Sequence, residues 1–209
     1  MRFACRIVAL LALLSAAPLA AQRDVVRLEI AVTPGSVQEG PAVSTANLLG
    51  DADTRDLLAH GFTAGIHYRL ELWREGTFVN DFDGRSEWDV LVSYDPTRNL
   101  YSVVRKQNSD ILENFGAFRT LDSAETMFGR PMRVPLRPNR AGRYYYNLIV
   151  EVRALTESDL DAVMQFMRGS RRGSNPFSFI GTGIKKLLSQ VLGGAKRHYE
   201  QQSVFFSFP

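Results

Sequence analysis

Residues 65–75 place four chemically versatile side chains on alternate positions. In GIHYRLELWRE, these are His67, Arg69, Glu71 and Trp73, and apolar residues occupy most of the positions between them. Such alternation is typical of a half-buried β-strand, whose successive side chains point to opposite faces. The four side chains would then form one strip. An Arg–Glu pair beside a Trp is ordinary on a solvent-exposed face, and we favour that interpretation. Partner binding through Arg69, Glu71 and Trp73 is the functional alternative.

The acids of NDFDGRSEWD have the composition of a calcium-binding loop. Helix–loop–helix calcium sites need acids at the first, third, fifth and twelfth loop positions. Aligning the glycine with the sixth position puts Val79 first and Val90 twelfth, so the register fails. The segment instead predicts a hairpin tip with an Asp–Gly turn. We therefore predict no metal site, and Asp81, Asp83 and Glu87 stay an alternative as a weak calcium loop.

Motifs for catalysis or nucleotide binding are absent from the sequence. There is no G-x-S-x-G, H-E-x-x-H or S-x-x-K, and GTGIKKLLSQVLGG lacks the spacing of a phosphate-binding loop. We therefore predict a non-catalytic protein without a cofactor. A hydrolase stays an alternative, because catalytic groups are assembled in space and not in sequence.

The first 21 residues have the three parts of a secretory signal peptide. Arg2 and Arg6 precede the apolar run IVALLALLSAAPLA, and the small residues Ala20 and Ala21 follow it. The run is shorter than the roughly 20 residues that span a bilayer, so we expect cleavage and a periplasmic or otherwise extracytoplasmic location. The only cysteine, Cys5, lies in this segment. The mature chain should therefore contain neither a disulfide nor a thiol.

The C-terminal part of the chain is strongly basic. Residues 166–209 contain seven Lys and Arg side chains and one acid, Glu200. This imbalance suggests an acidic partner, or docking of the tail on the more acidic body. The tail residues that we consider for partner binding are Arg171, Arg172, Lys185 and Lys186. Nucleic acid is not an expected partner of an exported chain.

Residues 183–192 predict an amphipathic helix in this tail. Five apolar residues follow helical spacing: Ile184, Leu187, Leu188, Val191 and Leu192. Lysines lie on the opposite face. Such a helix could pack on the body or on a partner, or it could lie on an anionic membrane surface.

Alternation of period two through most of residues 22–168 predicts an antiparallel sheet. The predicted inward sets are Val26, Leu28, Ile30 and Val32; Trp88, Val90, Val92 and Tyr94; and Tyr144, Tyr146, Leu148, Val150 and Val152. LYSVVRK and SVFFSF predict two more strands. The Gly- and Pro-containing residues 33–52 and 169–182 are predicted to be loops.

Two segments of the body predict helices. In DSAETMFG, Asp122 and Glu125 would form a capping box, and Gly129 would end the helix. TESDLDAVMQFMRG, which begins at Thr156, would form a longer helix folded across the sheet.

The predicted fold is mainly β: an antiparallel β-sandwich-like domain of about seven strands with two or three peripheral α-helices. The chain would comprise a signal peptide (1–21), the sandwich domain (22–168) and a basic tail (169–209). The amphipathic helix and a terminal strand belong to this tail, which we expect to pack on the same domain.

The order of these features resembles the bacterial domain-of-unknown-function family 4390. The resemblance rests on LWR, YDPTRNLY and the LDSAE helix start, and it covers roughly residues 25–155 and the last few residues. The basic insertion from about Arg168 to Arg197 departs from the family pattern. The resemblance implies an exported bacterial domain, encoded in some cases near membrane sensor kinases. It implies no activity and no functional residue.

Export, segregated charge and missing catalytic motifs lead to one functional hypothesis. The protein would be a periplasmic accessory module that binds another envelope protein, such as a membrane sensor or an assembly component. The alternative is a carrier of a lipid or other apolar small molecule in the sandwich interior or under the amphipathic helix.

Overall fold

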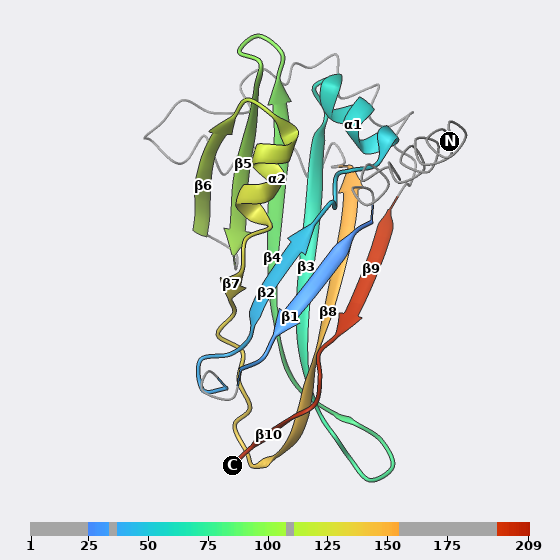
Figure 1. Cartoon of the computed structure of the whole chain (residues 1–209), viewed down its shortest axis with the longest axis vertical. Coiled ribbons are helices and arrows are strands. Elements are labelled where there is room, and N and C mark those ends of the chain that lie inside the picture. Colours follow the sequence, from blue (N-terminus) through green and yellow to red (C-terminus); the bar gives the residue numbers. More distant parts are fainter. Residues whose placement is uncertain (1–24, 34–36, 108–110, 155–195) are drawn as a thin grey trace, which may run out of the picture.

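A large antiparallel sheet forms one layer of the molecule (Figure 1). The structure is a computed structural model that describes residues 25–33, 37–107, 111–154 and 196–209. Along the sheet lie β6 (Ile111–Phe118), β5 (Leu100–Gln107), β4 (Asp81–Asp95), β3 (Thr63–Arg74) and β8 (Gly142–Ala154). Two strands pair with successive parts of β8: β10 (Phe206–Phe208) and β9 (Arg197–Gln202).

A small sheet packs against the large one and makes the second layer (Figure 1). Its strands are β1 (Arg27–Ala31), β2 (Ala42–Ala46) and β7 (Met132–Arg133), all antiparallel. Two short helices lie on the same side of the large sheet: α1 (Ala52–Ala59) and α2 (Leu121–Phe128). The predicted fold class is therefore confirmed: a mainly β, antiparallel, sandwich-like arrangement with peripheral helices.

The core lies between the two sheets and is made by the predicted alternation. On β3, the even-numbered residues from Ile66 to Leu72 are at most 2% exposed. The predicted inward residues of β8, from Tyr144 to Val152, are also buried, and those of β4 are buried except for the half-buried Tyr94. Val26, Leu28, Ile30 and Val32 pack against this core from the small-sheet side. Burial of one face is what fixes the strand register.

The prediction of a single loop over residues 33–52 is wrong, because these residues contain β2. Its sequence, AVSTA, has small side chains and no clear apolar period. Pairing with β1 stabilises it: Val43 lies opposite Ile30 and is 3% exposed. The polar strand β9 was not predicted either, and it depends in the same way on its neighbour β8. Tertiary pairing outweighs local propensity in both strands.

The predicted capping box of α2 is wrong. Thr120, and not Asp122, is the N-cap: its hydroxyl accepts a hydrogen bond from the backbone N–H of Ser123 at 3.1 Å. Glu125 turns inward and accepts a hydrogen bond from the backbone N–H of Leu49. The predicted end of the helix at Gly129 is confirmed.

Several predictions lie outside the described residues. They are the signal peptide, the helix from Thr156, the loop over 169–182 with Arg171 and Arg172, and the amphipathic helix with Lys185 and Lys186. Within the described ranges, no helix has the length and apolar character needed to cross a membrane.

Candidate functional site

The predicted strip lies on the face of the large sheet that is turned away from the small sheet, which we call the outer face. Its charged members interact with each other: the Arg69 guanidinium lies 3.0 Å from a Glu71 carboxylate oxygen. The indole N–H of Trp73 donates to the other oxygen of Glu71, also at 3.0 Å. The Glu71 side chain is 14% exposed and that of Arg69 is 37% exposed. The strip is therefore a paired, half-buried surface, with Trp73 at one end.

His67 continues this strip toward the other end of β3. Its Nδ1 lies 2.8 Å from Asp89 on β4. Glu151 faces His67 from β8, and Lys196 binds Glu151 at 2.7 Å. The hydrogen bond to Asp89 raises the pKa of His67 above its ordinary value, against the opposing effect of burial.

Asp89→Asn is expected to lower the pKa of His67, because it removes the main group that favours the imidazolium. A histidine whose pKa is higher in the folded state stabilises the fold at pH values below its unfolded-state pKa. This stabilisation is lost as pH rises through the folded-state pKa. The substitution should therefore lower the free energy of unfolding more at about pH 5.5 than at about pH 8.5. An NMR titration of His67 and urea unfolding at both pH values test this. Asp56→Asn, beside the exposed His60, is the control and should leave the His67 titration unchanged.

Aromatic side chains gather on the outer face where the strip ends. Trp73 packs edge-on against Phe82 at 5.3 Å between ring centroids, and Tyr145 packs against Phe205 at 5.2 Å. Trp73 and Tyr145 are register partners on β3 and β8. The Arg143 guanidinium lies 4.5 Å above the Phe205 ring. We call Trp73, Phe82, Tyr145 and Phe205 the aromatic patch.

The hairpin between β3 and β4 extends this apolar surface beyond the end of the sheet (Figure 1). Its tip exposes Phe78 (96%) and Val79 (77%), while Phe82 and Phe205 in the patch are 52% and 45% exposed. The amide of Asn80 donates to the Tyr145 hydroxyl at 3.3 Å and joins the tip to the patch. Several large, exposed apolar side chains in one region of the surface are typical of an interaction site.

The acids of the candidate calcium loop are not brought together. The predicted Asp–Gly turn is wrong, because Asp83 and its neighbouring glycine lie inside β4 and the chain turns over residues 75–80. The register of the pairing between β3 and β4 shifts between Leu72 and Trp73. Asp81 therefore lies opposite Arg74, and Glu87 lies opposite Arg69. These two acids consequently point to different faces of the sheet. Asp81 and Asp83 bind separate arginines, Arg74 and Arg140. Within the described ranges, no three His, Cys, Asp or Glu residues are grouped to hold a metal ion.

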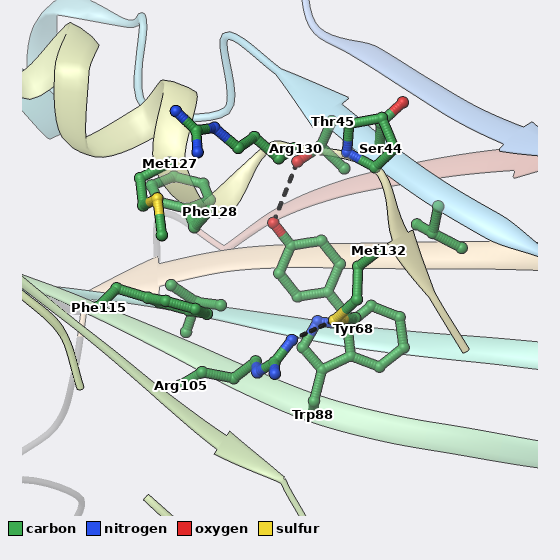
Figure 2. Close-up of a pocket in the computed structure, with 13 residues that line it drawn as sticks. Ser44, Thr45, Tyr68, Trp88, Arg105, Phe115, Met127, Phe128, Arg130 and Met132 are labelled. Carbon is green, nitrogen blue, oxygen red and sulfur yellow. Dashed lines mark hydrogen bonds between the residues drawn. The ribbon is translucent and has the colours of Figure 1, made fainter. Parts of the chain in front are cut away.

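A cavity of about 200 Å³ lies between the two sheets, beside α2 (Figure 2). Tyr68 and Trp88, stacked at 4.9 Å, form part of its wall. Phe115, Phe128 and Met132 make further apolar parts.

A second, larger hollow of about 950 Å³ lies between β2, α1 and α2 and has a lining of mixed polar and apolar residues. Burial raises the pKa of Glu125 in its wall, and hydrogen bonds from backbone N–H groups oppose the rise. The other acids that line it are paired: Asp51 with Arg197, and Asp122 with Arg55. The described residues that line the hollow include no histidine, cysteine or lysine that could act with Glu125 as an acid–base pair.

Glu125→Gln is expected to raise the free energy of unfolding at neutral pH. A carboxyl group with a raised pKa favours the fold when it is protonated. The fold loses stability when the pH rises and the group must ionise in its buried position. Glutamine keeps an oxygen for the Leu49 N–H and removes the buried charge. The gain should vanish below about pH 4, where the acid is neutral in both states. Urea unfolding at both pH values tests this, with the exposed Asp122→Asn as control. A loss of stability at neutral pH would contradict it.

The spacing of residues on β3 predicts the strip, but two other features were not predicted from the sequence. The aromatic patch joins β8 to Phe205 across a long stretch of chain, and no local pattern indicates that contact. Arg105, which lines the cavity, does leave a signal: it shares its parity with Tyr101 and the buried Val103, so it points toward the core.

The geometry offers exposed surfaces and a cavity for binding among the described residues. The resemblance to the domain-of-unknown-function family 4390 stays a prediction. The chain matches no family model, no curated protein and no solved structure.

Proposed function

We propose that this protein is a non-catalytic, exported accessory module that binds another envelope protein through the aromatic patch and the adjoining Arg69–Glu71 pair. The observation that carries the proposal is the exposure of Phe82, Phe205 and the hairpin tip beside a half-buried Trp. Trp, Tyr and Arg are the residues that contribute most at protein interfaces, and Phe is enriched there too.

The patch has the structure of an interface centre. Its rings are held by strand pairing and by contacts with each other, so little side-chain entropy is lost when a partner covers them. Charged groups lie beside the rings in opposite pairs: Arg143 with Glu75, and Arg69 with Glu71. This combination of an apolar centre and a polar rim favours a protein partner over a purely lipidic one.

In-cell crosslinking of the full-length chain tests the proposal. We expect wild type to capture a discrete protein, and the double variant Phe82→Ser/Phe205→Ser to lose it. With the purified partner, the double variant should lose about 2 kcal/mol or more of binding free energy, which is roughly a factor of 30 in Kd.

Val25→Ser is the matched control, because Val25 is 60% exposed and lies outside the patch. It should capture the same protein as wild type, and all variants should unfold at similar urea concentrations. Capture of one protein by all three forms would exclude the patch as the site. If the double variant instead loses only binding to anionic vesicles, the surface contacts membrane and the protein-binding proposal is wrong.

A further inference from the structure

The cavity between the sheets has a mainly apolar wall that contains the half-buried Arg105 and the exposed Arg130. Figure 2 shows Arg105 and Phe115 along one side, Met127 and Phe128 along the other, and the Tyr68 ring with Trp88 behind it. The Tyr68 hydroxyl is already bonded to Thr45 at 3.2 Å. The side chain that distinguishes this cavity from a simple packing defect is therefore Arg105.

Arg105 is held on the core side of β5 but is incompletely bonded there. It lies opposite Val90 in the register, and its side chain is 18% exposed. Its Nη groups contact Glu113 and the sulfur of Met132, and sulfur is a weak acceptor. Its Nε–H is buried without a hydrogen-bond acceptor. A ligand oxygen that replaced the weak sulfur acceptor would form a stronger hydrogen bond with the guanidinium.

The charge around the cavity favours an anion. Arg105 and the exposed Arg130 line it, while Glu113 is the acid paired with Arg105. Arg130 makes no ion pair with any described residue. A planar guanidinium matches a carboxylate well, because its N–H groups can form two parallel hydrogen bonds.

The volume of the cavity suits a small molecule. An engineered apolar cavity of about 150 Å³ holds benzene, so about 200 Å³ accommodates roughly eight non-hydrogen atoms. We propose that this cavity binds a small monocarboxylate with an apolar tail, whose carboxylate contacts Arg105 and whose tail packs against Tyr68 and Trp88. This site is separate from the aromatic patch and does not depend on the protein-binding proposal.

Trp88 gives a direct readout of binding. In a Trp73→Phe background, Trp88 is the only tryptophan of the chain, so a ligand that contacts it should change its fluorescence saturably. We expect hexanoate to bind, and hexan-1-ol, which has the same apolar tail without a carboxylate, to bind more weakly. Equal affinity for the two compounds, or no saturable change with hexanoate, would overturn the proposal. This comparison needs no change at Arg105.

Three variants assign the carboxylate contact. Arg105→Leu should weaken hexanoate binding about tenfold or more, the loss expected when a charge-assisted hydrogen bond is removed. Glu113→Gln should tighten it, because the competing carboxylate is removed while the guanidinium stays. Arg119→Leu, at an exposed position outside the cavity, should have no effect. If Arg105→Leu binds hexanoate as well as wild type, or if Glu113→Gln weakens binding, Arg105 serves only to pack on Phe115 and pair with Glu113.

Discussion

Replacement of Tyr68 by alanine is expected to lower the free energy of unfolding by about 3–5 kcal/mol, the usual effect of removing a buried aromatic ring. Tyr68 is 2% exposed and stacks on Trp88 at an interplanar angle of 9°. Its ring lies between the two sheets, and its hydroxyl reaches Thr45 on β2. The substitution removes the ring contact and the connection between the sheets together.

Tyr68→Phe separates these two effects. It keeps the ring and removes the bond to Thr45, whose half-buried hydroxyl can bond water instead. We expect a loss of about 0.5–1.5 kcal/mol. Burial raises the pKa of Tyr68 well above its ordinary value, so the hydroxyl stays protonated at any working pH. Urea unfolding of both variants provides the measurement, and equal losses would show that the hydroxyl, and not the ring, joins the sheets.

Gly40→Ala is the second substitution for which we expect a large effect, about 2–5 kcal/mol of destabilisation. Gly40 has a φ of +87°, a conformation that favours glycine. A Cβ there would lie 2.0 Å from the carbonyl oxygen of Val134 and 3.0 Å from the backbone nitrogen of Leu136. Neither backbone atom can move easily, because the Val134 N–H is bonded to the Pro41 carbonyl.

Gly61→Ala is the matched control for backbone conformation. Gly61 has a similar φ of +84°, but nothing lies within 4 Å of its added Cβ. Only the conformational term applies there, about 1–2 kcal/mol. Thermal or urea unfolding of the two variants should therefore rank Gly40→Ala as the more damaging. The reverse order would mean that the segment around Val134 yields without loss of packing.

The sequence predicts best the strands in which apolar and polar residues alternate strictly. Leu70 and Leu148 lie in long runs of period two, and both are fully buried on facing strands. β2 was missed because its small side chains are placed by β1 and β7 and not by their own pattern. The N-cap of α2 was misassigned because Thr120 and Asp122 are both good capping residues, and only the backbone geometry distinguishes them.

The candidate sites also differ in how well the sequence predicts them. The strip from His67 to Trp73 is a property of one strand, and so the spacing of its residues predicts it. The separation of Asp81 from Glu87 depends on an irregularity in the pairing of two strands, which only three-dimensional pairing determines. Phe205 reaches Tyr145 through the pairing of β8 with β9 and β10, and Arg105 lines a cavity whose other walls come from distant segments. These sites need coordinates because each one combines several elements.

The position of β3 in the middle of the large sheet has a consequence for the rate of folding. One of its neighbours, β4, follows it directly in the chain, but the other, β8, is synthesised much later. Leu70 therefore gains its pairing partner Leu148 only after β8 has been made. Local pairs of strands close quickly, and distant ones form slowly because a long loop must be ordered first. Until β8 arrives, one side of β3 presents unpaired backbone groups beside a row of apolar side chains, a surface on which other chains can add. The chain is therefore most prone to aggregate during this interval, before its central strand gains its second neighbour.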